Sequence, residues 1–378
     1  MRHLACVALL ATGVVDAAPA AAQIRIGSFV SATGPAAFLG EPERQTLEMY
    51  VAKINAEGGV NGEPLELIIY DDEGDANKAR TFASRLIDND EVVAIVGGST
   101  TGTTMAAVPL AEEAGIPLIS MAGAITIVDP VKEWVFKTPP TDRMACEKIF
   151  TDMQARGLGR IGMISGTDAF GSSMREQCLA VAGDFGIEVL ADETYGPRDS
   201  DMTPQLTKIR GAEGIQAVLN PGFGQGPAIV TRNFRQLGID LPLYQSHGVA
   251  SKSFIELAGD AADGVRLPAS ALLVVEQLPA DDPQKPILAA YKQTFEHQTG
   301  KPVSTFGGHA HDGLMILVDA IRRAGEADPA KIRDAIEQTA GFVGTAGEVT
   351  MSPEDHMGLG LGTFRMLEIQ NGDWVLAE

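Results

Sequence analysis

The chain has 378 residues, of which 45% are hydrophobic, and this length suits two domains of ordinary size better than one. Its 50 acidic and 29 basic residues give a formal net charge of −21. This balance excludes nucleic acid as a partner, because no basic stripe is available to neutralise phosphates. It also argues against adsorption to anionic lipid.

Residues 1–22 have the pattern of a secretory signal peptide. Arg2 and His3 form a short basic start, and residues 4–15 are mostly apolar but too few to span a bilayer. Three alanines end the segment, so we expect cleavage after Ala22. A buried N-terminal strand or helix is the alternative. No later segment is apolar for long enough to be a transmembrane helix, so we expect a periplasmic protein without membrane insertion.

The sequence contains three cysteines, and Cys6 would leave with the signal peptide. Cys146 and Cys178 could pair in an oxidising periplasm, although their spacing alone does not establish a bond. No CxxC motif is present, so neither a zinc knuckle nor a dithiol redox motif is indicated.

Strands and helices alternate from the mature N-terminus to about residue 270, which predicts two doubly wound α/β units. The first unit has expected strands at residues 24–30, 65–70, 92–96, 116–120 and 135–137, with helices between them. The second has expected strands at residues 160–165, 188–190, 217–220 and 241–245, helices at 172–185 and up to 237, and a further helix with Thr203 as N-cap. Beyond residue 270 helices dominate, and residues 364–376 form an expected hairpin that turns at Asn371-Gly372.

These two units predict two lobes with a cleft between them. We expect lobe 1 to comprise residues 23–141 plus 271–347, and lobe 2 to comprise residues 142–270 plus 348–378. The chain would cross between them near residues 137, 270 and 348.

No catalytic motif is present. The sequence has no GxGxxG after the first strand, no Walker A motif, no GxSxG elbow and no HExxH. His309-Ala310-His311-Asp312 alternates as metal ligands sometimes do, but no partner cluster accompanies it, so we favour packing or ligand contact. We therefore expect neither an enzyme nor a metal site, and no cofactor.

Two loops rich in small residues follow neighbouring expected strands. Residues 99–104 offer hydroxyl groups and free backbone N–H groups at a helix start, where the helix dipole favours an anion. Residues 120–124 follow the next strand with a similar opportunity. Since ligands of open α/β sheets bind beyond the carboxyl ends of the strands, the two loops together predict a carboxylate site. A plain capped helix start is the alternative for each loop alone.

The order of motifs resembles one known family. Residues 33–35 (Thr-Gly-Pro), residues 54–62 (Ile-Asn-Ala-Glu-Gly-Gly-Val-Asn-Gly), residues 70–72 (Tyr-Asp-Asp), residues 96–98 (Val-Gly-Gly) and residues 114–117 (Ala-Gly-Ile-Pro) recur in order. Together they resemble the leucine/isoleucine/valine-binding proteins of periplasmic ABC transporters, over the whole mature chain. The resemblance implies a type I periplasmic binding protein: two doubly wound α/β lobes, a three-stranded hinge and closure around a ligand.

The resemblance also implies a set of ligand-binding residues. The loop that grips the carboxylate corresponds to Thr100 and Thr101, and Asp142 is implied at the entry to the second lobe. The following loop corresponds to Ala122, Gly123 and Ala124, where an alanine replaces the threonine of the family. Side chains expected around the body of the ligand are Phe38, Leu39, Phe170, Phe223 and Phe306.

One position departs from the amino-acid binders of the family. A carboxylate of the second lobe receives the ligand's ammonium there, whereas His247 occupies that position here. A buried ammonium without an acidic partner is costly, while a histidine can donate to an oxygen. We therefore expect an aromatic acid, such as a hydroxybenzoate or a phenylpropenoate, or a keto acid.

The expected function is that of a solute-binding protein which delivers a small carboxylate to the permease of an ABC importer, acting as a monomer. The alternatives are a branched-chain or other amino-acid binding protein, a ligand-sensing receptor domain of the same fold, and an enzyme of unrecognised type.

Overall fold

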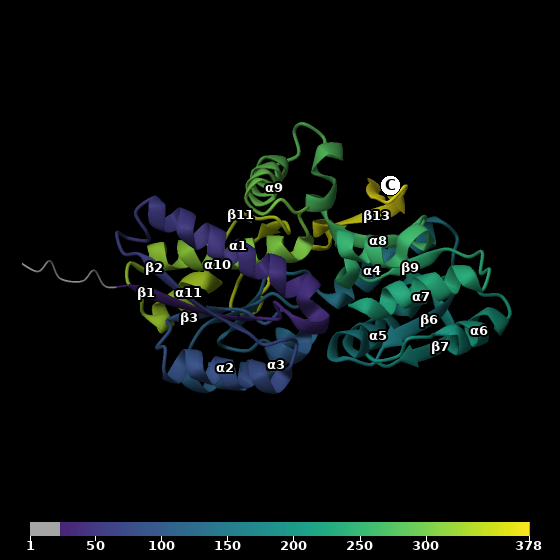
Figure 1. The fold of residues 1–378 in the computed structure, drawn as a ribbon, viewed down its shortest axis with the longest axis horizontal. Coiled ribbons are helices and arrows are strands. Elements are labelled where there is room, and N and C mark those ends of the chain that lie inside the picture. The colour runs from purple at the N-terminus through teal and green to yellow at the C-terminus, as the bar shows by residue number, and fades with distance from the viewer. Residues whose placement is uncertain (1–22, 378) are drawn as a thin grey trace, which may run out of the picture.

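The computed structural model describes residues 23–377. In that range the chain forms two α/β lobes side by side, with the purple and blue start of the chain in one lobe and the teal middle part in the other (Figure 1). The expected signal peptide, residues 1–22, lies outside the described residues. Between residues 23 and 377, no helix is both long enough and apolar enough to cross a membrane.

The first lobe is built on five parallel strands in the order β2-β1-β3-β4-β5. Helices α1 and α10 pack together, as do α2 and α3, and the two pairs lie on opposite faces of the sheet (Figure 1). The strands are β1 (Ile24–Val30), β2 (Leu65–Asp71), β3 (Ala94–Val96), β4 (Leu118–Ser120) and β5 (Val135–Lys137). The helices are α1 (Ala37–Ala56), α2 (Ala76–Asp88), α3 (Thr101–Ala114), α10 (Thr305–Ala324) and α11 (Pro329–Glu337).

The second lobe has a seven-stranded sheet in the order β14-β13-β10-β9-β8-β6-β7. Its C-terminal hairpin pairs antiparallel with the parallel part and turns at Asn371-Gly372, as predicted, with both residues at positive φ. The strands are β6 (Arg160–Gly166), β7 (Glu188–Tyr195), β8 (Ala217–Asn220), β9 (Leu243–Gln245), β10 (Arg266–Ser270), β13 (Phe364–Gln370) and β14 (Asp373–Leu376). The helices are α4 (Asp142–Ala155), α5 (Ala169–Val181), α6 (Thr203–Gly211), α7 (Gln225–Gln236) and α8 (Lys252–Ala258).

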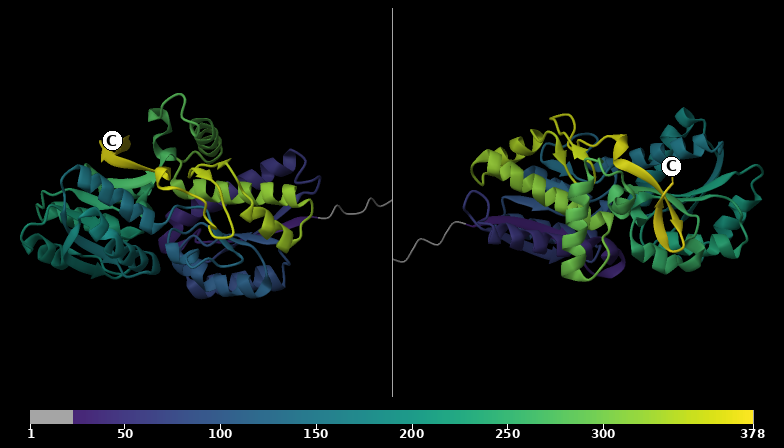
Figure 2. Two further views of the ribbon diagram at one scale, coloured as in Figure 1. Left: turned by 180° about the vertical axis from the view of Figure 1, so that it is seen from behind. Right: turned by 90° about the horizontal axis from the view of Figure 1, so that it is seen from above.

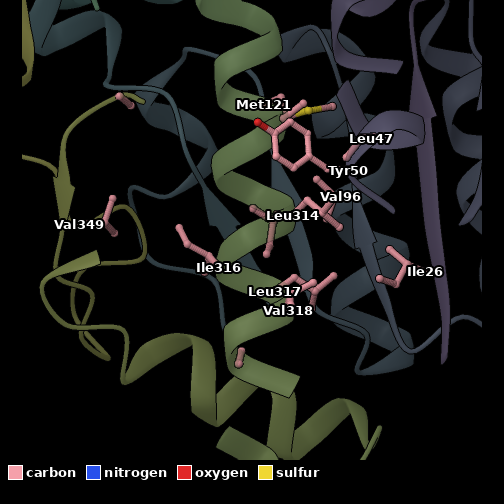
Figure 3. Packing of buried hydrophobic residues seen from close by; sticks show 14 of the residues in the cluster. Ile26, Leu47, Tyr50, Val96, Met121, Leu314, Ile316, Leu317, Val318 and Val349 are labelled. Atoms are coloured by element: carbon pink, nitrogen blue, oxygen red, sulfur yellow. The ribbon is translucent and has the colours of Figure 1, made fainter. Parts of the chain in front are cut away.

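The apolar stripe of α10 forms the centre of the first lobe's core. Leu314, Leu317 and Val318 are fully buried and point from α10 towards Leu47 and Tyr50 of α1 and towards the sheet (Figure 3). Because these residues recur every three or four positions, they lie on one face of the helix. The stripe packs α10 against α1. This packing also fixes the position of the start of α10, which carries Phe306 and His309.

The chain passes between the lobes three times, near residue 140, near residue 270 and before β13 (Figure 2). The last passage comes later than the expected boundary at residue 348. The short strands β11 (Phe342–Val343) and β12 (Glu348–Val349) pair with each other, and Val349, Met351 and Leu359 are buried in the core of the first lobe. Helix α9 (Lys285–Thr299) adds Leu288 and Phe295 to the same core.

Several predicted boundaries differ from those observed. Strands β3, β4 and β9 each begin two residues later than expected, and helix α5 covers residues 169–181 rather than 172–185. The helix expected to follow Thr203 has Met202 as its N-cap and includes Thr203 as its first residue. Strand β7 runs to Tyr195 rather than ending at residue 190, because it pairs with the whole length of β6. Asp192 and Glu193 interrupt the apolar pattern in the second half of β7, so the sequence pattern does not show the full length of the strand.

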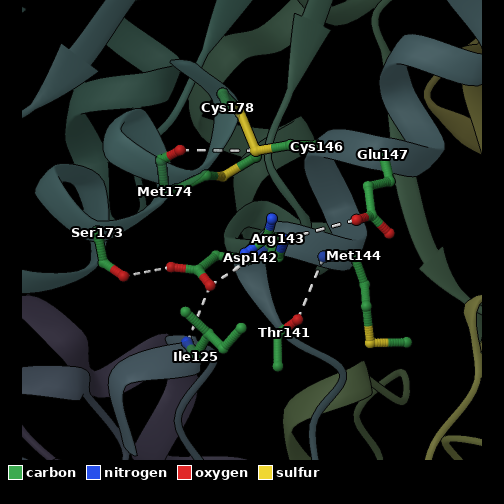
Figure 4. The surroundings of a disulfide bond; sticks show 10 residues. All are labelled: Ile125, Thr141, Asp142, Arg143, Met144, Cys146, Glu147, Ser173, Met174 and Cys178. Atoms are coloured by element: carbon green, nitrogen blue, oxygen red, sulfur yellow. Dashed lines mark hydrogen bonds and ion pairs between the residues drawn. A yellow bond between two sulfur atoms is a disulfide. The ribbon is translucent and has the colours of Figure 1, made fainter. Parts of the chain in front are cut away.

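Cys146 of α4 and Cys178 of α5 form a disulfide in the second lobe (Figure 4). Both residues are fully buried, and the Sγ atom of Cys146 also lies 3.5 Å from the backbone oxygen of Met174. The bond joins the two helices that follow the first passage between the lobes. It therefore stiffens the part of the second lobe that carries Asp142 and Phe170.

Candidate functional site

A cavity lies between the lobes, at the carboxyl ends of the parallel strands. Its volume is about 40 Å³. Both lobes contribute to its wall. The lining consists of Leu39, Ser99, Thr100, Thr101, Met121, Gly123, Pro139, Phe170, Phe223, His247, Gly248, Phe306 and His309.

The first wall is the hydroxyl-rich start of α3. Thr100 is the N-cap, and its Oγ1 accepts a hydrogen bond from the backbone N–H of Thr103 at 3.1 Å. Thr101 begins the helix and is 3% exposed, yet its hydroxyl has no partner among the described residues. An unpaired buried hydroxyl beside the positive end of a helix dipole is suited to an anionic oxygen.

The loop after β4 forms the next part of the wall, and its three expected residues are placed differently. Gly123 lines the cavity, whereas Ala122 and Ala124 are buried in the core beside α3 and do not line it. The loop is held by the Ser120 hydroxyl, which accepts the backbone N–H of Ala122 at 3.1 Å. The loop thus contributes Gly123, which has no side chain, and Met121 to the cavity wall.

Large apolar side chains from both lobes form another part of the cavity wall. Leu39 and Phe306 belong to the first lobe, and Phe170 and Phe223 belong to the second. The rings of Phe170 and Phe223 pack edge to face, with centroids 6.1 Å apart. Phe38 does not line this cavity; it lies at the rim, where its ring centroid is 6.2 Å from that of Phe223 across the lobes.

Two histidines face the cavity, one from each lobe. His247 follows β9, and His309 lies in the first turns of α10. Neither ring nitrogen of His247 has a hydrogen-bond partner among residues 23–377, and the same holds for Nδ1 of His309. Burial lowers the pKa of His247 to about 3 and that of His309 to about 4, so both rings are neutral at pH 7.

A buried lysine lies behind this part of the site. Lys137, at the end of β5, donates to the backbone oxygen of Gly123 at 2.9 Å and to that of Ala124 at 3.3 Å. Burial lowers the pKa of Lys137 to about 7, while the carboxylate of Asp142 opposes that shift. The positive charge of Lys137 in turn disfavours protonation of both histidines.

Asp142 is the first residue of α4, where the chain enters the second lobe, and it does not line the cavity. It accepts the backbone N–H of Ile125 at 2.9 Å from the first lobe and contacts the hydroxyl of Ser173 in the second (Figure 4). Burial raises the pKa of its carboxyl. Asp142 therefore ties the loop after β4 to helix α5 across the hinge.

The cavity wall contains residues that the sequence did not mark. Ser99 and Met121 belong to the two predicted loops, at residues 99–104 and 120–124, but Pro139 and Gly248 carried no signal. His309 stood out only for its metal-like spacing. No group of three or more metal-binding side chains occurs within the part of the chain that the structure describes.

A second, wider hollow adjoins the cavity and shares Thr100, Thr101, Phe170 and Phe223 with it. Its wall includes Glu73 of the first lobe and Asp168 of the second. Asp168 already accepts the backbone N–H groups of Phe170 and Gly171, each at 3.0 Å. Glu73 and Asp168 thus line this neighbouring hollow and not the cavity.

Known proteins resemble this chain along nearly its whole length. The "Leucine-, isoleucine-, valine-, threonine-, and alanine-binding protein" of Pseudomonas aeruginosa is 28% identical over 331 residues, which cover 87% of this chain and 86% of that protein. A "Leu/Ile/Val-binding protein homolog" of Brucella abortus is 25% identical over 346 residues, covering 89% of this chain and 86% of that protein.

Solved structures show the same architecture. The crystal structure of an extracellular ligand-binding receptor from Rhodopseudomonas palustris has a TM-score of 0.88 at 29% identity and covers 94% of this chain and 100% of that one. The substrate-binding protein LivJ from Streptococcus pneumoniae, in complex with isoleucine, has a TM-score of 0.84 at 24% identity and covers 94% and 99%. The fold is therefore that of the type I periplasmic binding proteins, as predicted.

The family model described as periplasmic binding protein matches residues 23–373, almost all of the described chain. The members of this family bind solutes outside the cytoplasm and are not enzymes, in agreement with the lack of catalytic motifs in this sequence. The chain belongs to the periplasmic binding protein family.

Proposed function

We propose that this protein captures a small organic carboxylate between its lobes and delivers it to the permease of an ABC importer. The observation that carries the proposal is the pairing of two features in one cavity. The wall has unpaired hydrogen-bonding groups at Thr101, His247 and His309, and it has no acidic side chain. Such a wall suits a ligand that brings oxygen acceptors and an apolar body.

The carboxylate would bind at the start of α3. The hydroxyl groups of Thr100 and Thr101, with the first backbone N–H groups of the helix, can satisfy carboxylate oxygens, and the helix dipole favours their charge. Lys137, in its protonated form, adds a positive charge close behind Gly123. The local donors thus oppose the repulsion expected from a chain of net charge −21.

The body of the ligand would lie against Leu39, Phe170, Phe223 and Phe306. Burying apolar surface there contributes about 25 cal/mol for each Å² removed from water. Phe38 would shield the rim rather than touch the ligand. Of the loop after β4, Gly123 would provide backbone contact, while Ala122 and Ala124 would only support it.

His247 is the residue that decides the class of ligand. A buried neutral imidazole can donate one hydrogen bond to a hydroxyl, keto or carboxylate oxygen, but it offers no negative charge to an ammonium. With His309 it forms a pair of imidazoles contributed by opposite lobes. We propose that they bind the oxygen substituents of an aromatic acid or a keto acid.

Closure follows from the division of the site between two lobes. The carboxylate would dock first on the first lobe, and Phe170, Phe223 and His247 would contact it only once the lobes meet. A ligand that makes these extra contacts stabilises the closed form selectively, which shifts the population towards it. The permease would then bind the closed form.

Binding of a branched-chain amino acid is the second candidate. The relative from Pseudomonas aeruginosa is named for five amino acids, and Glu73 and Asp168 line the hollow beside the cavity. In this case the ligand's ammonium would reach past Thr100 and Thr101 to one of those carboxylates. If Asp168 receives the ammonium, it would have to give up the N-cap hydrogen bonds that it accepts from the backbone at the start of α5.

A thermal-shift screen of the mature protein separates the two candidates. The panel is cinnamate, 4-hydroxybenzoate, 4-methyl-2-oxopentanoate and L-leucine, which share a carboxylate and differ in the rest. We expect one or more of the first three to raise the melting temperature and L-leucine to leave it unchanged. Stabilisation by L-leucine alone would assign the protein to the amino-acid binders.

A further inference from the structure

A buried acid lies directly beneath the hydroxyl loop of the cavity. Glu43, in the first half of α1, has no exposed surface. Its Oε2 is in hydrogen-bond contact with the hydroxyl of Ser99, and Ser99 lines the cavity. The other carboxyl oxygen, Oε1, has no partner in the described chain. Glu43 is thus one hydrogen bond away from the ligand without touching the cavity itself.

Within residues 23–377, no cationic side chain forms an ion pair with this carboxyl. The groups around it are the Ser99 loop, Ser31 after β1 and Asp72 after β2, whose own carboxyl accepts the Ser31 hydroxyl at 2.6 Å. Helices α9 and α10 also pack along α1, but their titratable side chains contact α1 at positions beyond Glu43. The Tyr291 hydroxyl of α9 meets Thr46, and the His311 ring of α10 packs on Tyr50.

Among the described residues, Glu43 forms no ion pair, which makes the uncharged acid its stable form. Burial and the nearby Asp72 accordingly raise the pKa of Glu43 to about 8, although the bond to Ser99 opposes this.

The hydrogen bonds that Ser99 can make depend on the protonation state of Glu43. A serine hydroxyl has one hydrogen to donate and two lone pairs to accept with. One lone pair accepts the backbone N–H of Ser31 at 2.9 Å. If Glu43 is ionised, it takes the hydroxyl's only hydrogen, and Ser99 presents just a lone pair to the cavity. If Glu43 is protonated, its O–H fills the second lone pair and the hydrogen of Ser99 is free.

We infer that Glu43, as an uncharged acid, turns the Ser99 hydroxyl into a donor for the ligand's carboxylate and so acts as a positioning residue. This inference rests on the proposed binding of a carboxylate at the loop before α3. Ionised Glu43 would weaken binding twice, because Ser99 could no longer donate and a second negative charge would lie close to the ligand.

The test compares the wild-type protein with Glu43→Gln by calorimetry at pH 6.5 and pH 9.5. The four probes are cinnamate, 4-hydroxybenzoate, 4-methyl-2-oxopentanoate and L-leucine. The amide of glutamine donates to Ser99 at every pH, as the protonated acid does. We expect the two proteins to bind within about threefold of each other at pH 6.5, and the wild type to bind about tenfold or more weakly at pH 9.5. Titration of the probe itself, or of Lys137, affects both proteins alike and cancels in the ratio.

Two further variants keep the result interpretable. Glu48→Gln makes the same charge change at an exposed position of α1 and should follow the wild type at both pH values. Ser99→Ala keeps Glu43 but removes the hydroxyl. Adding Glu43→Gln to Ser99→Ala should therefore change the affinity at pH 9.5 by a smaller factor than adding Glu43→Gln to the wild type. If the ratio of the affinities of the wild type and Glu43→Gln is the same at both pH values, the inference is overturned and the proposed function still stands. Failure of all four probes to bind at pH 6.5 would instead overturn the proposed function.

Discussion

Gly123 of the first lobe meets His247 of the second so closely that a side chain would not fit between them. A Cβ atom placed on Gly123 would lie 2.8 Å from Nε2 of His247 and 2.9 Å from Cε2 of Phe170. Contacts below 3.0 Å require a neighbour to move, and both rings are buried. The bare backbone at Gly123 is therefore what allows the lobes to approach.

The first prediction concerns closure. Gly123→Ala should bind the best ligand of the panel at least about tenfold more weakly, equivalent to about 1.4 kcal/mol. Small-angle scattering should show that the ligand compacts the variant less than the wild type. Gly102→Ala is the matched control, since a Cβ there would lie 3.9 Å from Thr100 and 4.0 Å from Ala169. Equal effects of the two substitutions would contradict a steric role for Gly123.

The second prediction concerns the class of ligand. His247→Glu places a carboxylate where amino-acid binders of this family are expected to have one. Calorimetry should show at least about tenfold weaker binding of aromatic or keto acids, because the new charge is buried beside an anion. Binding of L-leucine should strengthen. His247→Gln retains a neutral donor and should keep most of the original affinity. If His247→Glu leaves the affinity for the acids unchanged, His247 does not contact the ligand.

The third prediction concerns stability at acidic pH. His247 and His309 have lowered pKa values of about 3 and 4 in the folded protein, against an unfolded value near 6.5. Between these values the unfolded chain binds more protons, so each histidine reduces stability as the pH falls below about 6.5. For His309, the neighbouring Asp312 raises the pKa and Lys137 lowers it.

Urea unfolding of the wild type and His247→Gln at pH 7 and pH 5 isolates this effect. The wild type should lose about 2 kcal/mol more than the variant over that range. Buried acids such as Glu43, whose pKa is raised, gain stability as the pH falls, but they contribute equally to both proteins. If both proteins lose the same free energy of unfolding between pH 7 and pH 5, His247 is already protonated in the folded protein at pH 5.

The fourth prediction concerns the disulfide. Cys146 and Cys178 are 32 positions apart, so the bond restricts a sizeable loop of the unfolded chain. Replacing both cysteines with serine should lower the free energy of unfolding by roughly 3 to 4 kcal/mol. Reduction of the wild type by dithiothreitol should have a similar effect on the urea midpoint, whereas the double variant should not respond to dithiothreitol. Equal urea midpoints for the wild type and the double variant would mean that the disulfide does not form in the folded protein.

The alternation of strands and helices sufficed to predict both lobes, because buried parallel strands such as β3 are apolar throughout. Strand β7 was predicted too short because its residues are only partly buried and several are charged. The last passage between the lobes was placed too early because residues 348–359 carry no regular pattern. Their position depends on long-range burial of Val349, Met351 and Leu359.

The candidate site was predictable only in part, and for a physical reason. Loops at the carboxyl ends of strands, such as the one before α3, can be found because they follow apolar runs. The partner of His247 across the cleft cannot, since His309 is 62 positions away in the sequence and only the packing of α10 brings it there. The role of Glu43 could not be predicted from the sequence either, because a glutamate in a helix is usually exposed to solvent and only the structure shows that this one is buried.

A crystal structure of the mature protein with its most stabilising acid tests the central claim most directly. We expect the carboxylate to accept hydrogen bonds from the Thr100-Thr101 turn and another oxygen of the ligand to lie within hydrogen-bonding distance of His247. A zwitterion whose nitrogen pairs with Asp168 or Glu73, or a ligand whose carboxylate avoids Thr101, would contradict the account.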